Sequence, residues 1–257
     1  MNHELTEPPR WLAPPAWLLL QILLVGLGLV SLAWNLIALL LYPLLPRALG
    51  LRIGRAFIAR LYRLFWAVAS GFGMLRMNAS ALDVLAEERG LIVVSNHPSL
   101  LDALMIVSRL PRSGCVMKAS LMHNPFLGPG ARLARYVRND SASGLVRLAV
   151  ADLRSGGQLV MFPEGTRTTE VPLNPFKPGF ALIAKLAQAP VQVVFIDTDS
   201  PYLRKGWPLW KLPPLPIEFS VRLGQRFEPG HNANALTRDV ERHLREGVRV
   251  TRPRSDA

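Results

Sequence analysis

The chain has 257 residues, 50% of them hydrophobic, and its 30 Lys and Arg against 18 Asp and Glu give a formal charge of +12. An apolar and basic chain favours a membrane surface as partner, because its positive field attracts anionic headgroups. Nucleic acid would be attracted too, but the sequence has no zinc-finger spacing or RNA-binding signature, so we expect no nucleic-acid partner. The single cysteine, Cys115, excludes an internal disulfide, and nothing around it indicates a nucleophile.

Residues 1–46 are predicted to be a tail followed by a membrane segment. No charged residue occurs between Trp11 and Pro46, and this run exceeds the roughly 20 residues that cross a bilayer. The chain starts "MNHELTEPPR", whereas a cleaved signal peptide starts with a basic region. We therefore expect the segment to remain as an anchor, either as one span or as a hairpin that turns near Gly26 or Asn35.

Residues 47–74 are predicted to form a basic helix at the membrane interface. Five arginines recur in it at spacings of three to five residues, which places them on one broad helix face: Arg47, Arg52, Arg55, Arg60 and Arg63. This face is expected to hold anionic headgroups, and the alternative is a solvated helix of the soluble domain. The arginine excess also predicts that the rest of the chain is cytoplasmic, and we expect a bacterial inner membrane.

Residues 75–257 are predicted to form one α/β domain. Short apolar runs bounded by Gly or Pro predict buried strands at 90–96, 114–119, 157–162, 190–196 and 217–224. Helical spacing predicts helices at 101–110, 143–157, 179–189 and 237–249. The alternation predicts a mixed, mostly parallel sheet covered by helices. The segment "GWPLWKLPPLP" between them is expected to be a loop, which rests on lipid or crosses the domain surface.

The stretch "SNHPSLLD" begins where the strand at 90–96 ends. Ligands of open α/β sheets bind beyond the carboxyl ends of the strands, so His97 is placed for chemistry. Pro98 disfavours helix at His97, while Ser99 and Asp102 have the spacing of a helix cap. The carboxylate of Asp102 is then able to reach one ring nitrogen and leave the other free to accept a proton. The alternative is that Asp102 only caps its helix.

A second polar stretch, "LVMFPEGTRTTE", follows another predicted strand. Gly165 permits close approach of the backbone, Thr166 supplies a hydroxyl, and Arg167 has a planar fork that suits a phosphate. The structural alternative is that Glu164 and Arg167 pair with each other to hold a turn. We expect this turn to open on the same crevice as His97.

Together and in this order, "NHPSLLD" and "FPEGTR" resemble the glycerolipid acyltransferase family, whose best-known members make phosphatidic acid from 1-acyl-glycerol 3-phosphate. The resemblance covers roughly residues 75 to 200. Two more of the family's segments are matched through Lys118, Leu121, Pro125 and Gly128, and through Lys177, Gly179 and Pro190. The family's second motif is matched only loosely by "ARLARYVRND", where Arg138 is our choice for its arginine and Arg135 the competitor.

The resemblance implies a catalytic mechanism without a covalent acyl-enzyme or a metal. His97 is expected to act as general base on the acceptor hydroxyl, supported by Asp102. Backbone N–H groups at the start of the following helix are expected to stabilise the oxyanion. The implied substrate-binding residues are Glu164, Gly165, Thr166, Arg167, Arg138 and Lys118. No cofactor is expected, because acyl-CoA or acyl carrier protein serves as donor substrate. His3, His123, His231 and His243 are expected to be loop histidines.

Three functions remain open on the sequence. The first is acylation of 1-acyl-glycerol 3-phosphate at its sn-2 hydroxyl, as a step of phospholipid biosynthesis. The second is the same chemistry on another lysolipid, such as a lyso-aminolipid like lyso-ornithine lipid. The third is a non-catalytic lipid-binding scaffold. The expected partners are membrane lipids, the lysophospholipid acceptor and the acyl donor.

Overall fold

The computed structural model describes residues 13–249, so the predicted start of the apolar segment at Trp11 lies outside it. Its helices are α1 (Ala13–Leu44), α2 (Arg47–Gly71), η2 (Ser80–Leu85), α3 (Asp102–Arg109), η3 (Ala119–His123), α4 (Gly128–Leu133), α5 (Ala142–Arg154), α6 (Gly179–Ala187) and α7 (Ala233–Gly247). Its strands are β1 (Leu75–Asn78), β2 (Leu91–Ser95), β3 (Ser113–Met117), β4 (Val137–Arg138), β5 (Gln158–Met161), β6 (Val191–Asp197) and β7 (Ile217–Phe227).

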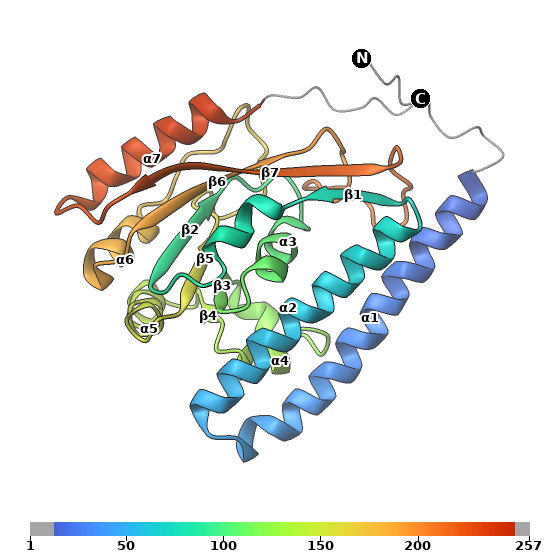
Figure 1. Cartoon of the computed structure of the whole chain (residues 1–257), viewed down its shortest axis with the longest axis horizontal. Helices are drawn as coiled ribbons and strands as arrows, with labels where there is room; N and C mark the ends of the chain where they lie inside the picture. Colours follow the sequence, from blue (N-terminus) through green and yellow to red (C-terminus); the bar gives the residue numbers. More distant parts are fainter. Residues whose placement is uncertain (1–12, 250–257) are drawn as a thin grey trace.

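The strands form a seven-stranded sheet in the order β1-β7-β6-β2-β5-β3-β4. All neighbours are parallel except β6 and β7, which confirms the prediction of a mixed, mostly parallel sheet. Figure 1 shows α2 and α3 on one face of the sheet and α5, α6 and α7 on the other. The central strands are therefore buried on both sides, as their continuous apolar sequences predict.

The core has two layers, one on each face of the sheet, and successive strand residues pack into opposite layers. In β2, Val93 packs with the cluster under α2 and α3, whereas Ile92 and Val94 pack with the cluster under α5, α6 and α7. All the residues of β2 and β5 are buried. The predicted strands and helices of this domain are all present, while the edge strands β1 and β4 were not predicted because their four and two residues carry no clear apolar run.

Helix α1 is continuous through Gly26 and Asn35, so the alternative of a hairpin at either residue is wrong. Residues 14–44 are long and apolar enough to cross a membrane. One side of α1 nevertheless packs on the domain: Leu20 and Trp34 are buried, and the indole N–H of Trp17 donates to the carbonyl of Trp210 in the proline-rich loop. The other side is an exposed apolar stripe of Leu18, Ile22, Val25, Leu29, Leu36, Leu40 and Leu44.

Helix α2 runs beside α1 (Figure 1) and packs against α3 and α4. The predicted single face of arginines is wrong for Arg55, whose side chain is only 2% exposed. Arg55 forms a bidentate ion pair with Asp152 at 2.9 Å and donates to the carbonyls of Ala134 and Arg112. Burial raises the pKa of Asp152, while Arg55 acts in the opposite direction. This arginine therefore joins α2 to the domain rather than to lipid.

Cys115 is buried in β3 and provides a test of the core. Burial raises the pKa of its thiol to about 12, and only the thiolate is a nucleophile. At about pH 8, thiolate is then about 10⁻⁴ of the folded population, compared with about a quarter of the unfolded population. We expect a thiol reagent to label the folded full chain at least about 100-fold more slowly than the chain in denaturant. Equal rates would contradict the burial of Cys115.

Candidate active site

The loop that carries His97 is fixed to the sheet at its first residue. The side chain of Asn96 donates to the carbonyl of Ile196 and accepts from the Ile196 N–H, both at 2.8 Å, so it continues the pairing of β2 with β6. Asn96 lies inside the "SNHPSLLD" stretch, but the sequence analysis did not assign it this role. The loop therefore leaves β2 in a defined direction, and Pro98 follows before the helix starts at Asp102.

His97 and Asp102 form the predicted pair. The Nδ1 atom of His97 lies 2.9 Å from Oδ2 of Asp102, and the same oxygen accepts the Ser99 N–H at 2.7 Å. The imidazole stacks on the ring of Phe162 at 4.0 Å. With Nδ1 held by the carboxylate, Nε2 is the nitrogen left for a substrate, and the His97 side chain is 16% exposed.

The carboxyl group of Asp102 is fully buried. Burial raises its pKa, while the hydrogen bonds from His97 and Ser99 act in the opposite direction. The carboxylate thus orients His97 and binds the Ser99 N–H of the preceding loop. The N-cap of α3 is Leu101, without a side-chain cap hydrogen bond, so the alternative that Asp102 only caps its helix is wrong. The N–H groups of Ser99, Leu100, Leu101 and Asp102 already donate within the protein, so these four are not available to the oxyanion that the start of α3 was predicted to stabilise.

The turn after β5 wraps around His97. Oε1 of Glu164 accepts the His97 N–H at 3.1 Å and the Thr168 hydroxyl at 2.7 Å, and the Thr168 N–H donates to the His97 carbonyl. Oε2 of Glu164 accepts the N–H of Asn174. Glu164 is 3% exposed, and these contacts hold the two loops together. The alternative of a Glu164–Arg167 pair is wrong, because the two side chains have different partners.

Arg167 is held by backbone carbonyls on the other side of the site. Its Nη1 donates to the carbonyls of Leu203 and Arg204 at 2.8 and 3.0 Å. Leu203 has φ +57, and its carbonyl also accepts the Leu100 N–H. A left-handed leucine is uncommon, and here it turns its carbonyl toward both Arg167 and the start of α3. The guanidinium is oriented while its other N–H groups remain for a ligand.

Gly165 lies against the side chain of Lys177. The sequence analysis matched Lys177 to the family but did not assign it to the site. A Cβ atom on Gly165 would lie 2.8 Å from Nζ of Lys177. Lys177 is exposed, and its N–H donates to the carbonyl of Pro163 at the base of the turn. Gly165 itself has φ +71. The signal available in the sequence was the position of Lys177 ten residues beyond Arg167, before a helix start.

Replacing Gly165 by Ala is expected to reduce activity more than stability. The left-handed backbone makes alanine cost about 1 kcal/mol of unfolding free energy, and the added methyl displaces the ammonium of Lys177. We expect the turnover of this site to fall about 10-fold or more, measured beside urea unfolding. Gly73→Ala is the matched control, because Gly73 also has φ +71 and nothing lies near its added Cβ. Equal activity in both variants would contradict the role of Gly165.

Lys118 and Arg138 lie on the same edge of the sheet as His97, but farther along it. Strands β5, β3 and β4 follow β2 in order, and strands are spaced about 4.8 Å apart. The end of β3, next to Lys118, is therefore about 10 Å from the end of β2, and the end of β4, at Arg138, about 14 Å. Arg138 pairs with Asp140 at 3.3 Å. The predicted residues thus share an edge, and Arg138 is the most distant of them.

The other histidines lie away from this centre, and two are not in loops as predicted. His123 lies in η3, and His243 lies in α7, where its Nε2 accepts the Gln225 N–H. Among the described residues only His231 is in a loop, as predicted, and His3, for which a loop was also predicted, lies outside them. Within residues 13–249, no group of three or more His, Cys, Asp or Glu side chains is placed to hold a metal ion.

The chain is similar to acyltransferases in sequence and in fold. The profile of a family described as Acyltransferase matches residues 76–197. The human 1-acyl-sn-glycerol-3-phosphate acyltransferase beta is 35% identical over 133 residues, which cover 47% of this chain and 46% of the relative. The 1-acyl-sn-glycerol-3-phosphate acyltransferase of Limnanthes douglasii is 30% identical over 135 residues, 49% of this chain and 47% of the relative. The chain therefore spans about half the length of the curated relatives it matches.

One solved structure extends the similarity to most of the chain. The crystal structure of the 1-acyl-sn-glycerophosphate (LPA) acyltransferase PlsC from Thermotoga maritima superposes with a TM-score of 0.63 and covers 90% of this chain and 93% of that one. The two sequences are 21% identical. This likeness establishes that the two chains share a fold, with the site described above at the carboxyl edge of its sheet.

Proposed function

We propose that the chain, which matches an Acyltransferase family over residues 76–197, moves a fatty acyl chain from an acyl thioester to the sn-2 hydroxyl of 1-acyl-glycerol 3-phosphate. The product is phosphatidic acid. The observation that carries the proposal is the pair of His97 and Asp102, with its 2.9 Å contact at Nδ1 and a free Nε2. The names of the matched relatives supply the acceptor.

Each residue at this centre has a chemical part to play in the proposed reaction. Nε2 of His97 removes the proton of the acceptor hydroxyl as its oxygen attacks the thioester carbonyl carbon. The tetrahedral intermediate then expels the thiol, as the C–S bond breaks and the sulfur takes the proton back from His97. The hydroxyl and N–H of Thr166 have no partner among the described residues, so they are our candidates for stabilising the oxyanion. No cofactor takes part in these steps.

The acceptor phosphate is assigned to the cations nearest His97. In lysophosphatidate only two carbons and one ester oxygen separate the attacking oxygen from the phosphorus, so the phosphate lies within about 5 Å of that oxygen. Arg167, oriented by two carbonyls, and Lys177, above Gly165, belong to the turn that wraps His97. Lys118 is within reach from the end of β3. Arg138, about 14 Å along the edge, is too distant for the same phosphate.

Membrane attachment is assigned to the exposed stripe of α1. Its uncharged face of leucine, isoleucine and valine would be immersed in lipid, while the opposite face remains on the domain. The chain would then act at the membrane that holds its acceptor. A cytoplasmic catalytic domain on a bacterial inner membrane accords with the arginines that follow α1. Labelling of a cysteine placed at Arg238 in intact and permeabilised cells tests the orientation.

Replacing Arg167 by Lys tests the assignment of the acceptor phosphate. Lysine keeps the charge but loses the fork and the contacts with the carbonyls of Leu203 and Arg204. We expect the KM for lysophosphatidate to rise roughly 10- to 100-fold, while transfer to monoacylglycerol, which lacks the phosphate, keeps its rate. Arg238→Lys, at an exposed position of α7, is the matched control. An equal loss with both acceptors would assign Arg167 to the protein scaffold instead.

A further inference from the structure

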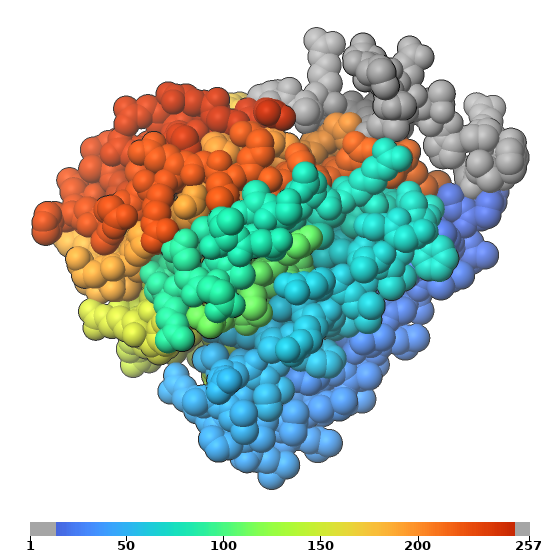
Figure 2. Space-filling view, viewed as in Figure 1, coloured from blue at the N-terminus to red at the C-terminus, as the bar shows by residue number. Residues whose placement is uncertain are grey.

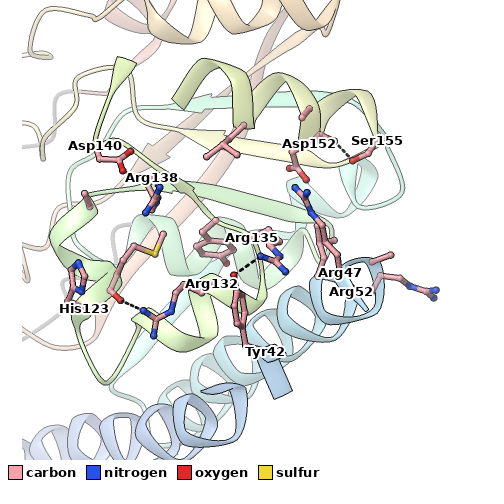
Figure 3. A pocket seen from close by; sticks show the side chains of 17 residues that line it. Tyr42, Arg47, Arg52, His123, Arg132, Arg135, Arg138, Asp140, Asp152 and Ser155 are labelled. Carbon is pink, nitrogen blue, oxygen red and sulfur yellow. Dashed lines mark hydrogen bonds and ion pairs between the residues drawn. The ribbon is translucent and has the colours of Figure 1, made fainter. Parts of the chain in front are cut away.

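A large groove runs along the β4 edge of the sheet, outside the centre built around His97. Its volume is about 1110 Å³, and its walls come from the end of α1, the start of α2, η3, α4 and α5. Figure 3 shows Arg138 and His123 at one end and Arg47 and Arg52 at the other. In Figure 2 the surface is indented between the start of α2 and α5. The groove exceeds the space that a single phosphate requires.

The groove carries a surplus of positive charge. Five arginines and two aspartates line it. Of the two carboxylates, that of Asp152 is already neutralised by the buried Arg55, and that of Asp140 pairs with Arg138. Arg47 and Arg52 are exposed. Arg47 interacts electrostatically with Asp152, whose carboxylate is already paired with Arg55, and Arg52 has no carboxylate partner among the described residues. Arginine forks bind phosphate oxygens in pairs and stack on planar rings, so the lining suits a ligand with several phosphates and an aromatic base.

Arg135 lines the groove from an unusual backbone position while contacting α1. It follows α4 with φ +56, a helix-end position where glycine is the residue that avoids backbone strain. Its Nη1 donates to the hydroxyl of Tyr42 at 2.9 Å, and its guanidinium lies 4.7 Å from the centre of the Tyr42 ring. Its Nε is buried without a partner among the described residues. An arginine at a strained position that lines a cavity and has an unpartnered buried Nε is a candidate for ligand binding.

The distance between the groove and His97 matches the length of the pantetheine arm of one type of acyl donor. The groove begins at Arg138, about 14 Å along the sheet edge from His97. In a coenzyme A thioester, the pantetheine arm between sulfur and the first phosphate has about as many bonds as four extended residues, which span roughly 14 Å. A thioester carbonyl at His97 would therefore place the phosphates at the start of the groove, with the remaining nucleotide inside it.

We propose that this groove binds the phosphorylated nucleotide end of a coenzyme A thioester. The proposal rests on the proposed acyl transfer and adds the class of donor to it. It also gives Arg138 a function at the donor rather than at the acceptor phosphate. Acyl carrier protein has the same arm but no nucleotide beyond its phosphate, so it would leave most of the groove empty.

The test compares donors and variants of the full chain in detergent. Wild type should use acyl-CoA at least about 10-fold more efficiently in kcat/KM than acyl-pantetheine, which lacks all the phosphates. Arg135→Gly and the double variant Arg47→Gln/Arg52→Gln should each lower kcat/KM for acyl-CoA about 10- to 100-fold and leave acyl-pantetheine unaffected. Arg60→Gln, an exposed position on α2 outside the groove, is the matched control. Glycine relieves the strain at residue 135 but loses the contacts with Tyr42. The two effects oppose each other, so Arg135→Gly should unfold at a urea concentration close to that of wild type.

Two further measurements separate the remaining outcomes. Titration calorimetry with CoA itself tests the groove without turnover. Binding of CoA that both variants weaken supports the proposed nucleotide site. If such binding is found but no acyl transfer occurs with any acceptor, only the proposed function is overturned. Binding to phosphatidylglycerol vesicles is the second. Variants that lose vesicle binding but keep CoA binding and acyl-CoA efficiency would make the groove a lipid headgroup site and overturn the proposal. A preference for acyl carrier protein that the arginine variants abolish would overturn it as well.

Discussion

Replacing His97 by Ala should lower the rate of acyl transfer by about 10² to 10⁴-fold, because the variant loses the group that accepts the hydroxyl proton in the proposed reaction. The imidazole stacks on Phe162 and contacts Asp102, but its backbone N–H still donates to Glu164 in the variant. The loop therefore keeps its anchor and the fold should remain. The measurement is the single-turnover rate of the full chain with lysophosphatidate and acyl-CoA, beside its circular dichroism.

The control for His97 is His231, which is exposed in the loop before α7. His231→Ala should keep the wild-type rate. Asp102→Asn is a second variant that tests the same pair. Its amide keeps the size of the side chain but no longer stabilises an imidazolium at His97. It should lose a comparable factor in rate with little change in KM. A His97→Ala variant with more than about a tenth of the wild-type rate would show that another group acts as base.

Replacing Arg55 by Leu should destabilise the protein by about 3 to 5 kcal/mol, because it leaves the buried carboxylate of Asp152 without its partner. The carbonyls of Ala134 and Arg112 also lose their donors. The pKa of Asp152 is already raised by burial, and it rises further without Arg55. A folded pKa above the unfolded value makes the ionised form the unstable one. The loss should therefore be smaller near pH 4 than near about pH 7, because only the part due to Asp152 depends on pH.

Urea unfolding of the full chain in detergent at both pH values measures this effect. The double variant Arg55→Leu/Asp152→Leu should recover most of the stability, because an apolar pair needs no charge compensation. Arg242 is the matched control, since it pairs with Asp239 on the exposed surface of α7, and Arg242→Leu should change the free energy of unfolding by less than about 1 kcal/mol. Similar losses at Arg55 and Arg242 would contradict the burial of the Arg55 pair.

Much of the sheet and its helices was predictable because buried parallel strands are continuous apolar runs, as in β2 and β5. The edge strands β1 and β4 were missed for the same reason, since an edge strand buries less. Arg55 shows the limit of helical spacing. Its neighbours Arg52 and Arg60 are exposed, so period alone places all three together, whereas the carboxylate that draws Arg55 inward comes from α5, 97 residues later.

The candidate site shows the same division between local and distant determinants. The contact between His97 and Asp102 follows from a spacing of five residues, and the sequence predicts it. The carbonyls that orient Arg167 come from Leu203 and Arg204, and the ammonium above Gly165 comes from Lys177. No local pattern links those residues to the turn. The strand order places Arg138 three strands from His97. This order depends on long-range pairing that the sequence does not reveal, so the sequence analysis assigned Arg138 to the acceptor phosphate without knowing that distance.

The most direct test of the proposed reaction is product identification with the purified full chain in nanodiscs, offered acyl-CoA and a set of lysolipids that differ only in headgroup. Phosphatidic acid formed from lysophosphatidate, at a rate that His97→Ala abolishes, is the result we predict. Turnover confined to another lysolipid would contradict the acceptor, and the absence of turnover that depends on His97 with every lysolipid would contradict the reaction itself.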